Sequence, residues 1–151
     1  MITDLPAHGS EAEQYAIVTS RFNAPVTERL AAGARATLLE AGIAAEAIHD
    51  YSVAGAWELV PVVAAALDAG RFRAVVACGA VIRGETPHFD QIARAATDGL
   101  ARLQLEARTP VGFAVLTTDT PEQAFARADK KGGEAALAAL EVADVLESFR
   151  R

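Results

Sequence analysis

The chain has 151 residues, of which 52% are apolar and 23% charged, and its formal net charge at pH 7 is −6. This length suits one domain with a sizeable core, and the acidic balance argues against nonspecific binding to nucleic acid or to an anionic membrane. The single cysteine, Cys78, excludes an internal disulfide framework and a cysteine-based metal site, and we interpret it as a small residue of the core.

The N-terminal segment, residues 1–14, is polar and acidic and lacks the apolar stretch of a signal peptide. No apolar run in the chain reaches the length of a membrane span. We therefore expect an N-terminal arm over residues 1–14, a single domain over residues 15–151 and a cytoplasmic location.

Apolar runs of strand length alternate along the chain with apolar residues at helical spacing. In chain order they predict a strand over 15–19, a helix over 25–41, a weaker strand over 47–53, a helix over 57–69, a strand over 73–80, a long helix from Pro87 through Leu103, a strand over 111–116, a short helix from Pro121 and a final helix to about Phe149.

Several of these helices have recognisable end signals. Gly42 and Gly70 are expected to end the first two helices, because glycine readily adopts the left-handed conformation found there. Thr120 and Gln123 form the pattern of a capping box, with Pro121 at the first helical position. We expect the pair Gly132-Gly133 to interrupt the helix that starts there.

The alternation of four strands with helices predicts an α/β fold: a three-layer αβα sandwich of the flavodoxin-like kind, with a four-stranded parallel sheet. In such a fold ligands bind beyond the carboxyl ends of the strands. The segments after each predicted strand are therefore the places to look for a site.

The turn between the third predicted strand and the long helix has the pattern of an anion site. Thr86 stands where an N-cap is expected and Pro87 at the first helical position. Gly84 permits a tight turn that leaves the amides of Glu85 and Thr86 free to hold an anion, most often phosphate. His88 would then lie beside that phosphate, and such an arrangement is typical of a catalytic site.

This turn also resembles a known family. The segment 79–89, GAVIRGETPHF, resembles the signature of the 6,7-dimethyl-8-ribityllumazine synthases, which catalyse the penultimate step of riboflavin biosynthesis. Segments 20–23, 54–59 and 115–124 resemble the same family and follow the other three predicted strands. The likeness extends in order from about Tyr15 to near the C-terminus.

The resemblance implies a transferase that condenses 5-amino-6-(D-ribitylamino)uracil with 3,4-dihydroxy-2-butanone 4-phosphate and releases phosphate and water. It implies no cofactor, and no residue cluster of the sequence has metal-ligand spacing. The positions that match the uracil and ribityl site are Phe22, Asn23, Gly55, Ala56, Trp57, Glu58, Ala80, Val81, Ile82 and Phe113. Those that match the phosphate site are Gly84, Glu85, Thr86, Arg127 and Lys131.

Without the resemblance, several of these residues have ordinary structural interpretations. Trp57 and Phe113 read as core residues, and Glu58 as a carboxylate that meets a helix dipole. Arg127 reads as a solvated cation at the end of a short helix. The polar neighbours of Phe22, in contrast, favour a partly exposed ring that suits stacking on a flat heterocycle.

His88 carries the predicted chemistry. A lone histidine is more often a structural or surface residue, and that alternative stays open. A helix N-terminus disfavours the imidazolium form while a neighbouring phosphate favours it, so the two effects leave a ring suited to proton transfer near neutrality. The resemblance assigns proton transfer to this position and implies that Glu134 orients the histidine.

The resemblance further implies a site shared between subunits, with Phe113 and Arg127 supplied by a neighbour. The family forms pentamers, decamers and sixty-subunit icosahedral shells, and riboflavin synthase is a candidate partner. Family members usually have a longer connection than residues 128–131 between Arg127 and Gly132. This shortening puts the reach of Lys131 and the assembly in question.

Two other function classes remain open at this stage. One is a flavin- or lumazine-binding protein without turnover, and the other is a shell-forming paralogue. The intact RGETPH segment favours the enzyme, because a protein that only binds has no need of a phosphate turn beside a proton carrier.

Overall fold

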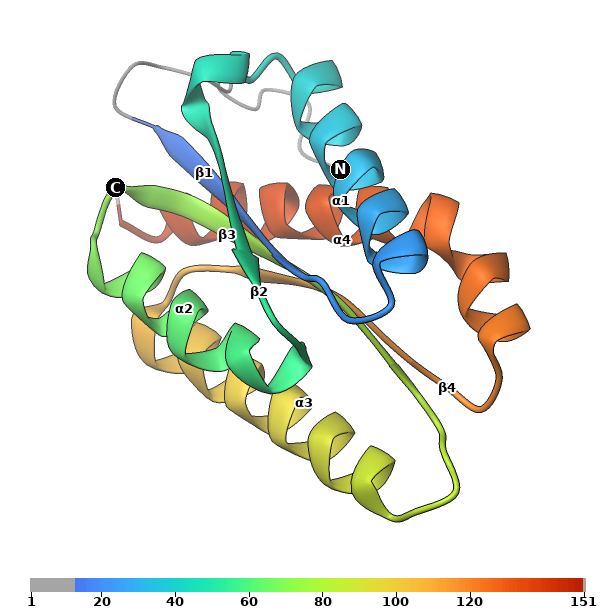
Figure 1. Cartoon of the computed structure of the whole chain (residues 1–151). Helices are drawn as coiled ribbons and strands as arrows, with labels where there is room; N and C mark the ends of the chain where they lie inside the picture. The colour runs from blue at the N-terminus through green and yellow to red at the C-terminus, as the bar shows by residue number, and fades with distance from the viewer. Residues whose placement is uncertain (1–12, 151) are drawn as a thin grey trace.

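The computed structural model describes residues 13–150. Its centre is a four-stranded parallel sheet in the order β2-β1-β3-β4, as Figure 1 shows. The α/β prediction is thus confirmed, and the strand order is that of the flavodoxin-like folds. The strands are β1 (Gln14–Ser20), β2 (Ile48–Val53), β3 (Phe72–Ile82) and β4 (Val111–Thr118).

Two helices cover each face of the sheet, as Figure 1 shows. On one face lie α1 (Ala24–Glu40) and α4 (Pro121–Ser148), and on the other α2 (Ala56–Asp68) and α3 (His88–Ala107). A short 3₁₀ helix, η1 (Ala45–Ala47), precedes β2. Every predicted strand is present, and β3 and β4 run further toward the candidate site than expected.

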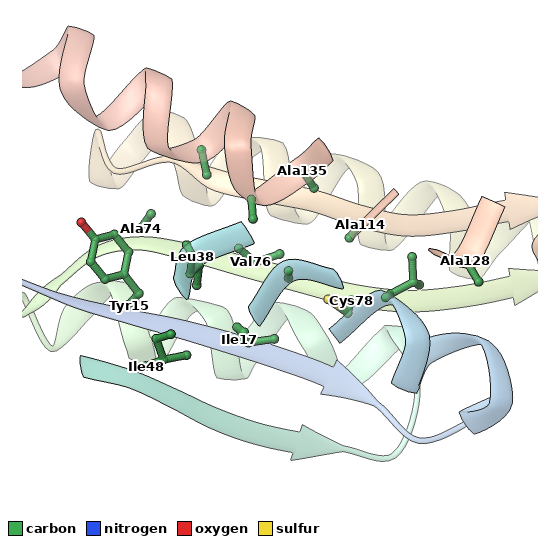
Figure 2. Packing of buried hydrophobic residues seen from close by; sticks show 14 of the residues in the cluster. Tyr15, Ile17, Leu38, Ile48, Ala74, Val76, Cys78, Ala114, Ala128 and Ala135 are labelled. Carbon is green, nitrogen blue, oxygen red and sulfur yellow. The ribbon is translucent and has the colours of Figure 1, made fainter. Parts of the chain in front are cut away.

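The core consists of two apolar layers, one on each face of the sheet. Successive strand residues point to opposite faces, so Ile17 packs toward α1 and α4 while Val18 packs toward α2 and α3. Figure 2 shows the first layer, with Leu38 beside Val76 and Ile17 below them. Cys78 lies in this layer, as predicted, and burial raises the pKa of its thiol to about 12.

The helix ends largely follow the predicted signals. Gly42 and Gly70 follow α1 and α2 with φ of 92° and 73°. Thr120 and Gln123 form the predicted capping box at the start of α4. Thr86, in contrast, does not cap α3: the helix begins at His88, Pro87 occupies the N-cap position, and no side chain caps it.

The prediction that Gly132-Gly133 would interrupt the last helix is wrong. Helix α4 runs unbroken for 28 residues. A Cβ atom on Gly132 would lie 1.9 Å from the backbone oxygen of Leu30 on α1. The glycine therefore permits close approach of two helices rather than a break. As a result residues 128–131 are helical, and Arg127 lies in the second turn of a long helix, not at the end of a short one.

Most of the predicted N-terminal arm, residues 1–12, lies outside the described residues, and Gln14 already belongs to β1. Among the helices that the structure describes, none combines the length and apolar character needed to cross a membrane.

Candidate active site

A cavity of about 820 Å³, which we call the cleft, opens at the carboxyl end of the sheet. Its walls come from the segments after β1, β2 and β3 and from the first turns of α2 and α3. The lining residues are Phe22, Ala54, Gly55, Ala56, Trp57, Glu58, Ala80, Val81, Ile82, Gly84, Thr86, His88, Phe89, Gln91 and Ile92. The fold thus joins residues from three predicted motifs in one place.

Phe22 stands at the rim of the cleft with 72% of its surface exposed. Its backbone amide donates to the oxygen of Ala54 over 2.9 Å. The next residue, Asn23, has a φ of 65° and donates from Nδ2 to the backbone oxygen of Ala80 over 3.1 Å. Asn23 does not line the cleft but holds the chain beside it, so the ring of Phe22 is presented as an open aromatic surface.

Trp57 and Glu58 form the wall contributed by α2. Trp57 is 59% exposed, so its interpretation as a core residue is wrong. Glu58 is half-buried in the first turn, where a carboxylate interacts favourably with the helix dipole. A Cβ atom on Gly55 would lie 3.2 Å from Glu58 Oε1, so the carboxylate folds back over that glycine.

The last residues of β3 supply an apolar surface to the cleft. Ala80 and Val81 are buried, and Ile82 is half-buried. Small and apolar side chains beside an exposed aromatic ring suit a flat organic ring, with the few polar groups around it setting orientation.

The turn that follows β3 presents free backbone donors. Arg83 N donates to Thr118 O over 2.9 Å, and Asp90 N is the next amide along the chain bonded to another backbone oxygen, that of Pro87 at 3.1 Å. Among the described residues, the amides of Glu85 and Thr86 have no backbone acceptor. Since no backbone oxygen accepts from these two donors, they stay available to a ligand.

Gly84, Thr86 and His88 line the cleft, whereas the Glu85 side chain does not. His88 is the first residue of α3, and it is exposed. Its ring is therefore accessible to a molecule held at the preceding turn, as proton transfer requires.

Four other predicted residues lie at the edge strand β4: Phe113 belongs to β4 itself, and Arg127, Lys131 and Glu134 belong to α4. Phe113 lines a cavity of about 280 Å³ together with Lys131 and Glu134. Arg127 lines one of about 390 Å³ with the same two residues of α4. None of the four lines the cleft. The structure of one chain therefore brings Phe22 and His88 together but leaves Arg127 and Phe113 apart from them.

These four residues are accessible. Phe113 is 38% exposed, which contradicts its interpretation as a core residue. Arg127 donates from Nη1 to the Gln123 oxygen of its own helix over 2.8 Å. Lys131 Nζ lies 3.8 Å from Glu134 Oε2. The β4 edge thus exposes an aromatic ring, two cations and a carboxylate.

Sequence reasoning did not assign four residues of the cleft, namely Ala54, Phe89, Gln91 and Ile92. Phe89 and Ile92 are among the apolar residues at helical spacing that predict the long helix, and such residues are expected to face the core; both are half-buried. The sequence spacing could have identified two of these residues. Gln91 and Ile92 lie three and four positions after His88 and so share its face of the helix.

Comparison with known proteins supplies the family. The family described as 6,7-dimethyl-8-ribityllumazine synthase matches residues 12–147. This chain belongs to that family. It is 54% identical over 140 residues to the 6,7-dimethyl-8-ribityllumazine synthase of Frankia casuarinae, covering 89% of this chain and 86% of the relative. The resemblance inferred from four short segments is confirmed.

Two further relatives carry the same name. The protein from Gemmatimonas aurantiaca is 48% identical, over 91% of this chain and 86% of its own. The protein from Desulfatibacillum aliphaticivorans is 39% identical, over 93% of this chain and 94% of its own. The likeness therefore includes both the cleft and the α4 segment.

Proposed function

We propose that this chain is a 6,7-dimethyl-8-ribityllumazine synthase, a transferase that condenses 5-amino-6-(D-ribitylamino)uracil with 3,4-dihydroxy-2-butanone 4-phosphate. The observation that carries the proposal is the cleft itself. It joins an exposed aromatic ring, a helix-bound carboxylate and a turn with free amides that leads directly into His88. Family membership over residues 12–147 supports the same conclusion.

The chemistry of the walls suggests how the two substrates lie. The uracil stacks on Phe22 against the apolar end of β3, and its ribityl chain extends along Trp57 toward the Glu58 carboxylate. The phosphate of the second substrate accepts from the Glu85 and Thr86 amides. This pose places the ketone near His88.

The reaction then needs only addition, elimination and proton transfer. The 5-amino group attacks the ketone carbon, and loss of water gives an imine. Removal of the proton on C3 expels phosphate from C4 and leaves an enol, which tautomerises to a ketone at C3. The ribitylamino nitrogen attacks this new ketone and closes the ring with loss of water. His88 accepts and returns the protons. Holding the two reactants together in the correct orientation can lower the activation barrier by roughly 7–11 kcal/mol. Modest side-chain chemistry is therefore sufficient.

The complete site, we infer, spans two copies of the chain. Phe113, Arg127, Lys131 and Glu134 are accessible at the β4 edge but lie outside the cleft of their own chain. A neighbouring copy can bring its Arg127 and Lys131 to the phosphate and its Phe113 to the heterocycle. The partner is then another copy of this chain, in a pentamer or a multiple of pentamers.

The direct test mixes the two substrates with the purified protein and follows lumazine fluorescence, while light scattering gives the assembly mass. Product formation by an oligomer supports the proposal. Tight flavin binding without product would instead favour a binding protein, and a fully active monomer would contradict the shared site.

A further inference from the structure

Arg83 joins three separate elements at the back of the phosphate turn. Its Nε lies 2.9 Å from Asp119 Oδ1, just after β4, and its Nη1 lies 3.4 Å from Asp90 Oδ1 on α3. Its guanidinium also lies over the ring of Phe89, 4.4 Å from the ring centroid. Arg83 therefore links the end of β3 to the start of α3 and to the segment that follows β4.

The turn itself has few other attachments. Residues 84–87 are all exposed, and within the described chain the amides of Glu85 and Thr86 bond to no backbone oxygen. Residues 83 and 90 bracket the turn, and their side chains are paired to each other. The Arg83 side chain thus closes a short loop around the segment that presents the free amides.

The other end of this link is also held in place. Asp119 accepts from Arg83 and donates its own backbone amide to Gln123 Oε1 over 2.8 Å. Gln123 belongs to the capping box that starts α4. The position of the turn is thereby linked to the first turn of the helix that carries Arg127.

We propose that Arg83 is a positioning residue for the anion-binding turn: by pairing with Asp119 and Asp90 it sets the direction of the Glu85 and Thr86 amides and the placement of His88. Arg83 does not line the cleft, whereas Phe89, on which it stacks, does. Two of its nitrogens and one face of its guanidinium already have partners. It acts on the ligand through the turn and not by direct charge pairing.

This inference deepens the proposed function, but it can be measured without turnover. Inorganic phosphate serves as the probe, with calorimetry for affinity and the NMR signals of the His88 ring as a local readout. The variants are Arg83→Ala, Asp119→Ala, the double variant and Arg83→Lys. Arg102→Ala is the matched control, because Arg102 is an exposed arginine of α3 in an ion pair with Glu106 at 3.9 Å.

If Arg83 positions the turn, Arg83→Ala and Asp119→Ala each weaken phosphate binding, on the order of tenfold, since small misplacements of a binding group have large effects. The double variant is no worse than either single one, because both changes break the same link. Arg83→Lys restores part of the affinity, and Arg102→Ala changes nothing. The His88 signals shift in the first three variants.

Loss of phosphate affinity in Arg83→Ala but not in Asp119→Ala would overturn the proposal and make Arg83 a direct phosphate ligand. Unchanged affinity in both would also overturn it. Thermal unfolding followed by circular dichroism confirms that each variant is folded. Wild-type protein that binds phosphate in this way but forms no lumazine would reject the proposed function while leaving the role of Arg83 supported.

Discussion

The side chain of Asn23 donates to the backbone oxygen of Ala80 over 3.1 Å and so connects the end of β1 to the end of β3. Asn23 also has a left-handed backbone, with φ of 65°, directly after the exposed Phe22. One residue therefore determines both the turn into α1 and the placement of the aromatic ring.

Substitution of Asn23 separates these two contributions. Asn23→Gly keeps the left-handed backbone but loses the hydrogen bond, and we expect it to lower the free energy of unfolding by about 1 kcal/mol. Asn23→Ala loses the bond and adds backbone strain of roughly 1–2 kcal/mol. Urea denaturation measures both. Equal stability of the two variants would show that the backbone conformation carries no strain.

Substitution of His88 tests proton transfer. His88→Ala should lower kcat about 10²- to 10⁴-fold, which is the usual contribution of a positioned general acid or base. Binding of the uracil should be nearly unchanged, because the ring of Phe22 remains. Trp57, the sole tryptophan, lines the cleft, so its fluorescence reports binding in the same samples. Unchanged turnover would remove His88 from the mechanism.

Substitution of Arg127 tests the second half of the site. Arg127→Ala should raise the KM for the butanone phosphate far more than the KM for the uracil, since it removes a charge-assisted contact to phosphate alone. Steady-state kinetics with each substrate varied in turn gives the comparison. Equal effects on the two KM values would count against a phosphate role.

The glycine pair in α4 offers a matched test of helix packing. In Gly132→Ala the new methyl group would lie 1.9 Å from the backbone oxygen of Leu30. In Gly133→Ala it would lie 2.8 Å from the Thr37 hydroxyl, which can move. We expect Gly132→Ala to lower the free energy of unfolding by at least about 1–3 kcal/mol, because the backbone of Leu30 cannot move aside. Gly133→Ala should lower it clearly less, because the Thr37 side chain can move and alanine favours the helix.

Chemical denaturation of the two alanine variants supplies the measurement. A similar loss of stability in both would contradict the close approach of α1 to α4 at Gly132. A greater loss of stability in Gly133→Ala than in Gly132→Ala would show that the tighter contact with α1 is at Gly133.

Burial of Cys78 predicts a pH dependence of stability. Burial raises the pKa of its thiol from 9.0 to about 12. The unfolded chain therefore releases this proton at lower pH than the folded one, so stability should fall as pH rises from about 9 to 12. Burial also raises the pKa of Tyr15, with the same sign. Cys78→Ala should flatten part of the decline, measured by denaturation across that range.

Local sequence patterns determined much of this molecule. The alternation of strands and helices follows from residue periodicity, and the capping box at Thr120 and the stop at Gly42 follow from the conformations that single residues favour. The turn before His88 could be identified for the same reason, because glycine permits a tight turn and proline fixes its own φ wherever they occur.

Other features depended on which surfaces meet in space. The pair Gly132-Gly133 resembles a helix break, yet at Gly132 the backbone of α1 lies so close that only glycine fits. Trp57 and Phe113 resemble core residues by composition, but the first turn of α2 and the edge strand β4 leave them accessible. The separation of Arg127 from His88 arises likewise from the sheet that lies between α4 and the cleft. Periodicity describes one element at a time, whereas burial and proximity depend on the packing of several, so only the folded chain could decide them.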